Sequence, residues 1–168
     1  GLYRIKGHHL IIHILKKILE KGHDAELWIV GEGYYKNSLA GLAKKLGIEK
    51  NVRFLGGKCH AGLALIYNKA DIFVLANYQE VTPAVNEAMA CRKPVVVMKT
   101  GGCDFAVPSS SYGLVAKRFD MEDMADKIIF LMKNKKIADR IARNGRKRIL
   151  KNFSIEKVGY KMYKAFIK

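Results

Sequence analysis

The chain has 168 residues, of which 49% are hydrophobic, and its 31 Lys and Arg against 15 Asp and Glu give a formal net charge of +16. A chain of this length that folds as one unit buries roughly 70% of its unfolded surface, so we predict one hydrophobic core and a single domain over residues 1–168. Its apolar runs are shorter than the ~20 residues that span a bilayer, which excludes a membrane-spanning helix. Its three cysteines lack CxxC spacing, which argues against a disulfide or metal framework.

Short β-rich runs alternate with helical patterns of about ten residues along most of the chain. In chain order we predict helices at residues 8–21, 35–46, 61–69, around 87, 121–133, 137–151 and 155–167, and strands at residues 25–30, 52–55, 71–75, 94–98 and 113–116. This alternation is typical of parallel βαβ units. The sequence therefore predicts an α/β fold, a doubly wound parallel sheet of the Rossmann-like type with helices on both faces.

Basic residues gather in the predicted helical segment 133–168, which holds thirteen Lys or Arg against two acids, Asp139 and Glu156, for a net charge of +11. We expect Ile137, Ile141 and Leu150 to pack against the sheet and most of the neighbouring bases to face outward. The densest cluster consists of Arg143, Arg146, Lys147, Arg148 and Lys151. Such a face is either merely solvated or binds a polyanion, and the candidate polyanions are an anionic membrane surface and a nucleic acid.

Two acidic residues, Glu80 and Glu87, flank a short turn that contains Pro83. The turn lies between the predicted strands at 71–75 and 94–98, at the carboxyl end of the first, where open α/β sheets bind ligands. A carboxylate there accepts hydroxyl protons in charge-assisted hydrogen bonds. The structural alternative is that Glu87 only stabilises the first turn of its helix through the helix dipole.

This segment resembles the donor-binding signature of retaining glycosyltransferases with the GT-B fold, the group 1 or family 4 enzymes. That signature has two glutamates separated by seven residues, followed by Ala-Met-Ala-Cys-Gly-x-Pro-Val. Residues 87–91 and 94–95 fit, whereas Arg92 replaces the glycine and six residues separate Glu80 from Glu87. In strict register the first acidic position falls on Gln79, so either Glu80 still reaches the site or Gln79 takes its place.

The resemblance covers nearly the whole chain and implies the C-terminal half of a GT-B enzyme without its first strand. Gly1 stands where the family has its diphosphate-binding arginine, so we expect the chain to be a fragment. We also expect no signal peptide. Arg4 would replace the missing arginine only if the loop is rearranged. The Lys-Gly pair that follows in the family matches Lys6 and Gly7. The resemblance gives Lys6 a catalytic role, because its charge would stabilise the departing diphosphate.

The resemblance implies roles for further residues. Glu87 would bind the ribose, and Glu80 would contact the transferred sugar as a second catalytic residue. Backbone N–H groups from Thr82 to Val85 would approach the phosphates. The loop that begins at Gly56 is where the family receives the base. Gly31 and Gly33 follow the predicted strand at 25–30, where they either let the backbone approach the nucleotide or simply turn the chain.

The function implied is sugar transfer from a UDP- or GDP-linked donor to a glycan or lipid acceptor, without a metal or a cofactor besides the donor. We expect the acceptor domain in a missing N-terminal half, a cytoplasmic location at the inner face of the membrane, and no activity from this chain alone. The alternatives are a GT-B-fold epimerase and a non-enzymatic basic domain that binds nucleic acid or acidic membrane. Nucleic acid is disfavoured because Phe153, Tyr160, Tyr163 and Phe166 fall at helical spacing, which is typical of a packed face.

Overall fold

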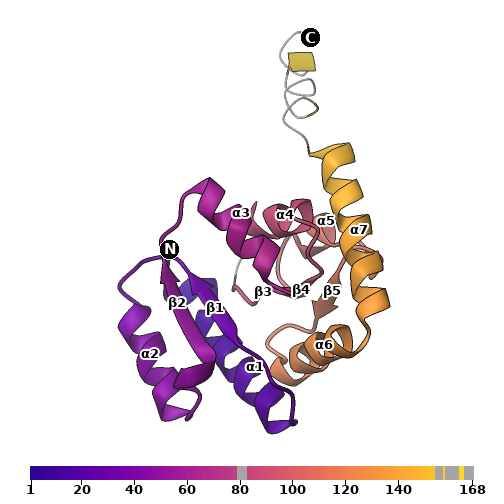
Figure 1. Ribbon diagram of the computed structural model, residues 1–168. Coiled ribbons are helices and arrows are strands. Elements are labelled where there is room, and N and C mark those ends of the chain that lie inside the picture. The colour runs from indigo at the N-terminus through magenta and orange to yellow at the C-terminus, as the bar shows by residue number, and fades with distance from the viewer. Residues whose placement is uncertain (79–82, 154–156, 158–162, 165–168) are drawn as a thin grey trace.

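The computed structural model describes residues 1–78, 83–153, 157, 163 and 164 (Figure 1). The helices are η1 (Arg4–Lys6), α1 (His8–Glu20), α2 (Lys36–Lys45), η2 (Glu49–Asn51), α3 (His60–Lys69), α4 (Pro83–Ala90), α5 (Cys103–Ala106), α6 (Met121–Lys133) and α7 (Lys135–Asn152). The strands are β1 (Leu27–Val30), β2 (Val52–Gly56), β3 (Phe73–Leu75), β4 (Val95–Met98) and β5 (Leu114–Ala116). The predicted alternation of strands and helices is confirmed.

The described strands form two parallel sheets, β1-β2 and β3-β4-β5. The common doubly wound order is 3-2-1-4-5-6, with the first strand at the centre. The strands found here fit this order if β2 and β1 correspond to its third and second strands, and β3, β4 and β5 correspond to its fourth, fifth and sixth strands. Among the described residues, β1 and β3 each have one strand neighbour only.

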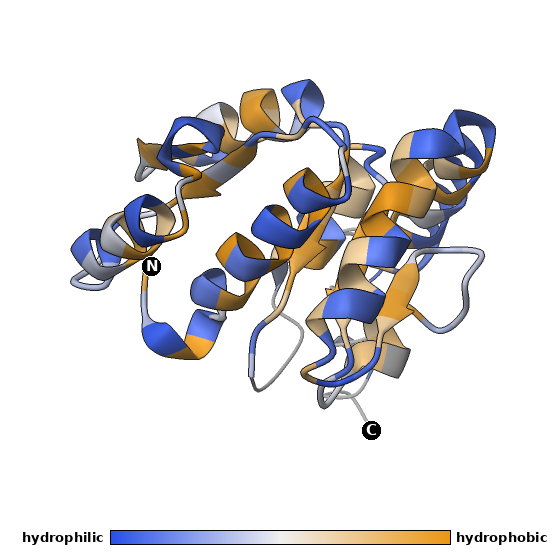
Figure 2. Ribbon diagram, turned by 90° about the horizontal axis from the view of Figure 1, so that it is seen from below, coloured by the Kyte–Doolittle hydropathy of each residue, from blue (hydrophilic) through white to orange (hydrophobic). Residues whose placement is uncertain are grey.

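Strand β4 shows why the sheet is covered on both faces. All four of its residues are buried, because successive side chains of a strand point to opposite faces and helices cover both. Val96 and Met98 pack in the cluster that α1 and α6 build. Val95 and Val97 pack in a second cluster with residues of α4 and α5. In Figure 2 the strands are mostly orange and the helices alternate blue and orange, as expected for helices with one buried face.

The end of α4 explains the glycine in the family signature. Arg92 N–H donates to the Met89 carbonyl at 2.9 Å and Lys93 N–H donates to the Ala88 carbonyl at 3.0 Å. This is a Schellman motif, in which the residue after the helix cap takes the left-handed conformation that favours glycine. Arg92 adopts it with φ of 56°. Its side chain forms an ion pair of 2.6 Å with Asp139 on α7.

One element and several boundaries differ from the sequence predictions. The short helix α5 was not predicted, because four residues are too few to show helical periodicity. Strands β1 and β3 each begin two residues later than predicted, at Leu27 and Phe73. Helix α7 begins at Lys135, two residues earlier than predicted, and its N-cap residue Asn134 makes no side-chain capping hydrogen bond. The predicted helix at 155–167 falls almost entirely outside the described residues.

Candidate functional site

The carboxyl ends of β1, β3 and β5 converge on one edge of the molecule, which we call the strand-end edge. It comprises residues 1–9, 31–35, 76–78 and 117–119, together with the first turn of α4. Backbone hydrogen bonds hold these segments together: Leu2 N–H donates to the Glu32 carbonyl at 2.8 Å, and Tyr78 N–H donates to the Ile5 carbonyl at 3.2 Å. The predicted ligand site of an open α/β sheet is therefore built from segments far apart in the sequence.

Glu87 lies on α4 with an exposed side chain, and its Oε2 accepts a hydrogen bond of 3.0 Å from the hydroxyl of Tyr67 on α3. The Tyr67 ring packs edge to face against Phe73 of β3, with centroids 5.8 Å apart. Burial, and then the negative charge of Glu87, raises the pKa of Tyr67, so the hydroxyl stays a donor at any physiological pH. A carboxylate has about four acceptor positions. Tyr67 thus orients Glu87 and leaves it capacity for a ligand with two hydroxyls.

Lys6 ends η1, and Gly7 follows it with φ of 70°. A Cβ added to Gly7 would lie 1.9 Å from the carbonyl oxygen of Ala76 at the end of β3, so only glycine fits. This explains the Lys-Gly pair: the glycine lets the backbone press against β3 and places half-buried Lys6 at the start of α1. Arg4 lies in the same short helix and is exposed.

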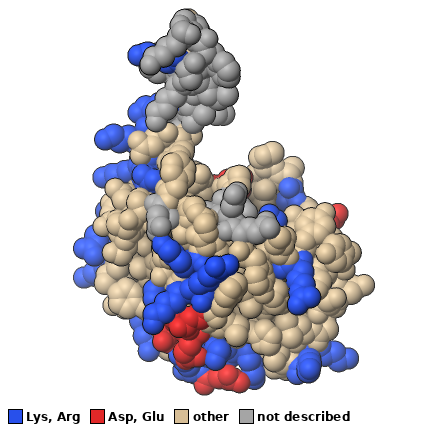
Figure 3. Space-filling view, turned by 180° about the vertical axis from the view of Figure 1, so that it is seen from behind, with Lys and Arg blue, Asp and Glu red and all other residues tan. Residues whose placement is uncertain are grey.

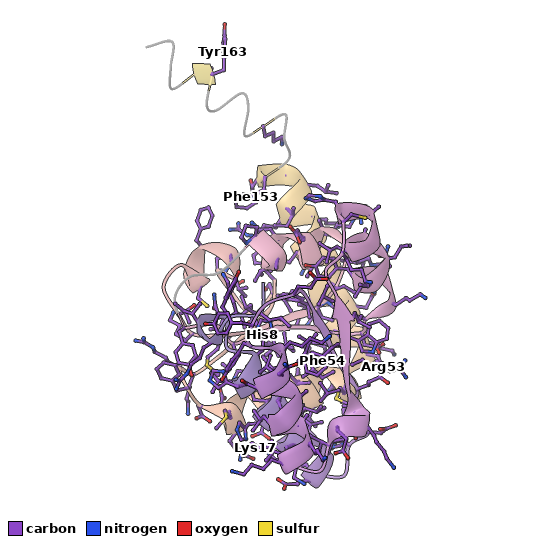
Figure 4. All side chains as sticks on the ribbon, turned by 90° about the vertical axis from the view of Figure 1, so that its left-hand side faces the viewer. His8, Lys17, Arg53, Phe54, Phe153 and Tyr163 are labelled. Atoms are coloured by element: carbon purple, nitrogen blue, oxygen red, sulfur yellow. The ribbon has the colours of Figure 1, made fainter. Side chains whose placement is uncertain are left out.

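Buried polar atoms without a hydrogen-bond partner are concentrated at this edge. Among the described residues they are His8 Nδ1, His9 Nδ1, Asn86 Oδ1 and Arg148 Nε, and the first three lie at the start of α1 or in the first turns of α4. Burial, and then the positive charges of the N-terminus, His9 and Lys6, lower the pKa of His8 to about 4. Figure 4 shows His8 at the first turn of α1, at the end of the helix that is away from Lys17. These atoms have no partner within the described protein, so each is available to water or to a polar ligand.

The predicted glycines come together at the ends of β1 and β2. Gly31 N–H donates to the Gly56 carbonyl at 2.9 Å, so this pair closes the two-stranded sheet. A Cβ on Gly33 would lie 2.5 Å from the Leu2 carbonyl oxygen, so this glycine permits a close backbone approach within the protein. Glu32 caps the neighbouring loop by accepting a bond of 3.3 Å from Gly57 N–H. The structure thus gives these glycines structural roles, and their contact with a nucleotide stays a prediction.

The turn before α4 is described only from Pro83 onward. Gln79, Glu80 and Thr82 lie outside the described residues, so the choice between Gln79 and Glu80 stays open. Val85 is completely buried, so its predicted approach to the phosphates stays a prediction.

The outward basic face predicted for α7 is confirmed, since Arg143, Arg146, Lys147 and Lys151 are exposed and Arg148 is half-buried. Two of these arginines also bond to the protein: Arg146 donates to the Ala90 carbonyl at 2.7 Å, and Arg148 donates to the Phe105 carbonyl at 2.6 Å.

The predicted buried side of α7 is correct for Ile141 and wrong for Leu150, which is 53% exposed. Ile149 is buried in its place.

Four of the exposed bases of α7 form a stripe at helical spacing. We call this the basic stripe, and it consists of Lys136, Arg140, Lys147 and Lys151. Within the described part of the chain none of the four forms an ion pair, whereas Arg143 pairs with Asp139 at 3.1 Å. Figure 3 shows Lys and Arg side chains along the edge of the molecule that α7 occupies, below the grey residues.

Two other kinds of feature are absent from the described residues. In residues 1–78 and 83–153 no group of three or more His, Cys, Asp or Glu side chains is placed to hold a metal ion. No helix in these ranges is both long and apolar enough to cross a membrane.

Sequence reasoning missed Tyr67 and Asn86 as site residues. Tyr67 lies twenty residues before Glu87 on a different helix, and only the packing of α3 against β3 brings its hydroxyl to the carboxylate. A local motif carries no signal for such a contact.

Comparisons with known proteins agree with this geometry. The family model for glycosyl transferases group 1 matches residues 2–148. The D-inositol 3-phosphate glycosyltransferase of Corynebacterium jeikeium is 33% identical over 133 residues, which cover 74% of this chain and 32% of that protein. The chain thus spans about a third of that relative's length.

Solved structures show the same fold. The sucrose-phosphate synthase of Thermosynechococcus elongatus superposes with a TM-score of 0.90 and 26% identity, covering 98% of this chain and 42% of that one. A point mutant of TarM from S. aureus, solved with fondaparinux, alpha-GlcNAc-glycerol and UDP, has a TM-score of 0.86 and 25% identity over 98% of this chain and 33% of that one. The α/β fold built on parallel strands is shared with these glycosyltransferases. The chain belongs to the group 1 glycosyl transferases.

Proposed function

We propose that the chain is the donor-binding half of a longer retaining glycosyltransferase that moves a sugar from a nucleoside diphosphate sugar to a glycan or lipid acceptor. The observation that carries this is the Glu87–Tyr67 pair, at 3.0 Å, beside the amino end of α4 and within the family signature. A positioned carboxylate can accept both hydroxyl protons of a ribose in charge-assisted bonds.

The rest of the strand-end edge suits the remainder of such a donor. The amino end of α4 offers backbone N–H groups and the positive end of a helix dipole to the diphosphate. Lys6 adds a full positive charge at the start of α1, which would stabilise the diphosphate as it leaves. In the retaining chemistry of this family, the leaving phosphate itself helps to remove the acceptor's proton. Sugar contact by Glu80 or Gln79 is part of the same proposal.

A uridine nucleotide is the first candidate for the donor, because the similar TarM structure contains UDP. Calorimetric titration of the chain with UDP, GDP and ADP and their glucose conjugates tests this choice. We expect Glu87→Ala to weaken binding of the preferred nucleotide by roughly 1–3 kcal/mol. Its thermal midpoint should stay close to wild type, because the Glu87 side chain is exposed.

The matched control is Glu49→Ala. Glu49 is an exposed acid in η2, which precedes β2 and therefore lies at the amino ends of the strands. If both variants bind the nucleotide like the wild type, or if the Glu49 variant loses as much affinity, the ribose assignment is wrong.

The chain on its own should not transfer sugar, because an acceptor site and the exclusion of water require the second half of such an enzyme. The measurement is transfer of radiolabelled sugar to a mixture of glycan and lipid acceptors. Sustained transfer by this chain alone would contradict the half-enzyme proposal.

We also propose that the basic stripe docks the protein on an anionic membrane, where a lipid-linked acceptor would be found. Each Lys or Arg near such a surface contributes about 1 kcal/mol. The four bases lie on one side of a rigid helix without acidic partners in the described chain, and exposed Leu150 lies between two of them in sequence. Nucleic acid is the rival partner, which vesicle and RNA binding at matched salt distinguish.

A further inference from the structure

The hydroxyl of Tyr67 contacts two groups in the first turns of α4. It donates to Glu87 Oε2 at 3.0 Å and to the carbonyl oxygen of Ala84 at 3.4 Å. Ala84 and Glu87 are three residues apart, so they lie on the same face of the helix. One hydroxyl therefore contacts both the side chain that would bind the ribose and the backbone of the helix that carries it.

Tyr67 is itself fixed by its surroundings. Its ring packs against the cluster that includes Val85 of α4, and it meets Phe73 of β3 edge to face. A second bond joins α3 to the end of α4, since Lys93 Nζ donates to the Asn68 carbonyl at 2.9 Å. A tyrosine side chain has only two χ angles, so this packing determines where its hydroxyl lies.

The contact matters because the Glu87 side chain is exposed. A free glutamate side chain samples several rotamers, and ordering it when a ligand binds costs conformational entropy. The Tyr67 hydroxyl orders the carboxylate in advance, and preorganisation of this kind raises affinity. The bond occupies one acceptor position of Oε2 and leaves Oε1 and the other position of Oε2 for a ligand.

A carboxylate held in this way suits two neighbouring hydroxyls. The 2′- and 3′-hydroxyls of a ribose can donate to it, one to each oxygen, in charge-assisted bonds. A 2′-deoxyribose offers only one hydroxyl, so one oxygen of the fixed carboxylate loses its bond. A carboxylate free to rotate would adapt to the single hydroxyl and to water, and would therefore discriminate less between the two sugars.

We infer that Tyr67 is a positioning residue that makes the donor site select ribonucleotides over 2′-deoxyribonucleotides, an inference that rests on the proposed function. Tyr67 acts through Glu87 and not by contact with the nucleotide. The selectivity depends on its hydroxyl, whereas the packing depends on its ring. Tyr67→Phe should therefore reduce the selectivity and leave the fold intact.

The test is calorimetric titration with UDP, GDP and ADP, each beside its 2′-deoxy analogue, of the wild type, Tyr67→Phe, Glu87→Gln and the double variant. For the nucleotide that binds best, Tyr67→Phe should weaken binding about three- to tenfold, as expected for one hydrogen bond. Binding of the deoxy analogue should weaken less. In the Glu87→Gln background the same change should have little further effect, because the two residues act through one contact.

The matched control is Tyr112→Phe. Tyr112 packs against the same cluster as Tyr67, but it precedes β5 and therefore lies at the amino ends of the strands, on the edge opposite the donor site. This variant should bind both kinds of nucleotide like the wild type. A loss of selectivity in the control equal to that in Tyr67→Phe would contradict the inference.

Two further outcomes would overturn it: Tyr67→Phe leaves the preference for ribose unchanged, or it weakens binding as much in the Glu87→Gln background as in the wild type. Either result would mean that Tyr67 only supports the start of α4 through the Ala84 carbonyl. If Glu87→Gln weakens ribonucleotide binding in the same experiment, the proposed donor site stands although this inference fails. If Glu87→Gln leaves that affinity unchanged, the ribose assignment fails as well.

Discussion

The strand-end edge and the basic stripe are two polar regions of this molecule that differ in the kind of contacts their side chains make and in the range over which they act. The edge holds the Glu87 carboxylate against the Tyr67 hydroxyl and stacks the ring of His9 on that of Tyr78, and both contacts join elements distant in sequence. The stripe is four permanent charges on one helix, held by no ion pair in the described chain. The edge would recognise a ligand through short-range hydrogen bonds and ring contacts, whereas the stripe would attract a partner through long-range electrostatic interactions.

This difference predicts different responses to salt. Hydrogen bonds and ring contacts act over a few ångströms and are affected little by ions, whereas exposed charges are screened over ~10 Å at 0.1 M salt and ~3 Å at 1 M. Nucleotide binding at the edge should therefore weaken with salt only through the attraction of Lys6 and the α4 dipole for the diphosphate, whereas vesicle binding through the stripe should fall steeply. The predictions below test this division, starting with the largest effect.

The largest effect is expected from replacing all four stripe residues by glutamine. At about 1 kcal/mol for each base, binding to vesicles that contain phosphatidylserine should weaken by about 4 kcal/mol, roughly a thousandfold. Co-sedimentation with and without the anionic lipid measures it. Nucleotide affinity should not change in this variant, because the stripe takes no part in the edge.

The matched control neutralises four exposed lysines elsewhere, namely Lys36, Lys44, Lys45 and Lys50 on α2 and η2. Equal loss of vesicle binding in the two quadruple variants would mean that net charge alone acts. Tighter binding to RNA than to anionic vesicles at matched salt would favour the nucleic-acid alternative.

The second-largest effect concerns how the stability of the protein depends on pH through His8 at the strand-end edge. Burial lowers the pKa of His8 from 6.5 to about 4, so the folded edge excludes a proton that the unfolded chain binds. The neutral imidazole therefore contributes stability that is present above pH 6.5 and is lost as the pH falls toward 4, by up to ~3 kcal/mol. Urea denaturation of the wild type and of His8→Gln between pH 7 and pH 4 measures it. A variant as sensitive to pH as the wild type would show that another group is responsible.

The third and smallest effect concerns Arg92, which joins α4 to α7. The left-handed conformation of Arg92 costs about 1–2 kcal/mol, and its exposed ion pair with Asp139 contributes at most about 1 kcal/mol. We expect Arg92→Gly to raise the free energy of unfolding by about 0.5–1 kcal/mol, after the greater flexibility of glycine in the unfolded chain is counted.

Arg92→Ala separates the two contributions, because alanine keeps the unfavourable conformation and loses the ion pair. It should be no more stable than the wild type. If urea denaturation shows the alanine variant stabilised as much as the glycine variant, backbone strain is not the cause.

Much of the fold could be predicted because its signals are local. The buried run of β4 and the alternating helices are written in the periodicity of hydrophobic residues, and the place of Glu87 follows from the strand before it. The bond from Tyr67 to Glu87 and the bond from Arg146 to the Ala90 carbonyl could not be predicted, since each is a contact between elements distant in sequence. Arg92 shows a third case. The motif revealed that a glycine is replaced, but only the dihedral angle shows that Arg92 takes the left-handed conformation that favours glycine.

The central claim is that Glu87 binds the ribose of a nucleotide, and a comparison of two ligands tests it most directly. The nucleoside diphosphate that binds best and its 2′,3′-dideoxy analogue are titrated into the wild type and into Glu87→Gln. We predict that loss of the two hydroxyls weakens binding to the wild type by roughly 1–3 kcal/mol and weakens binding to the variant far less. The same loss in both proteins would mean that Glu87 does not contact the ribose, and would contradict the account.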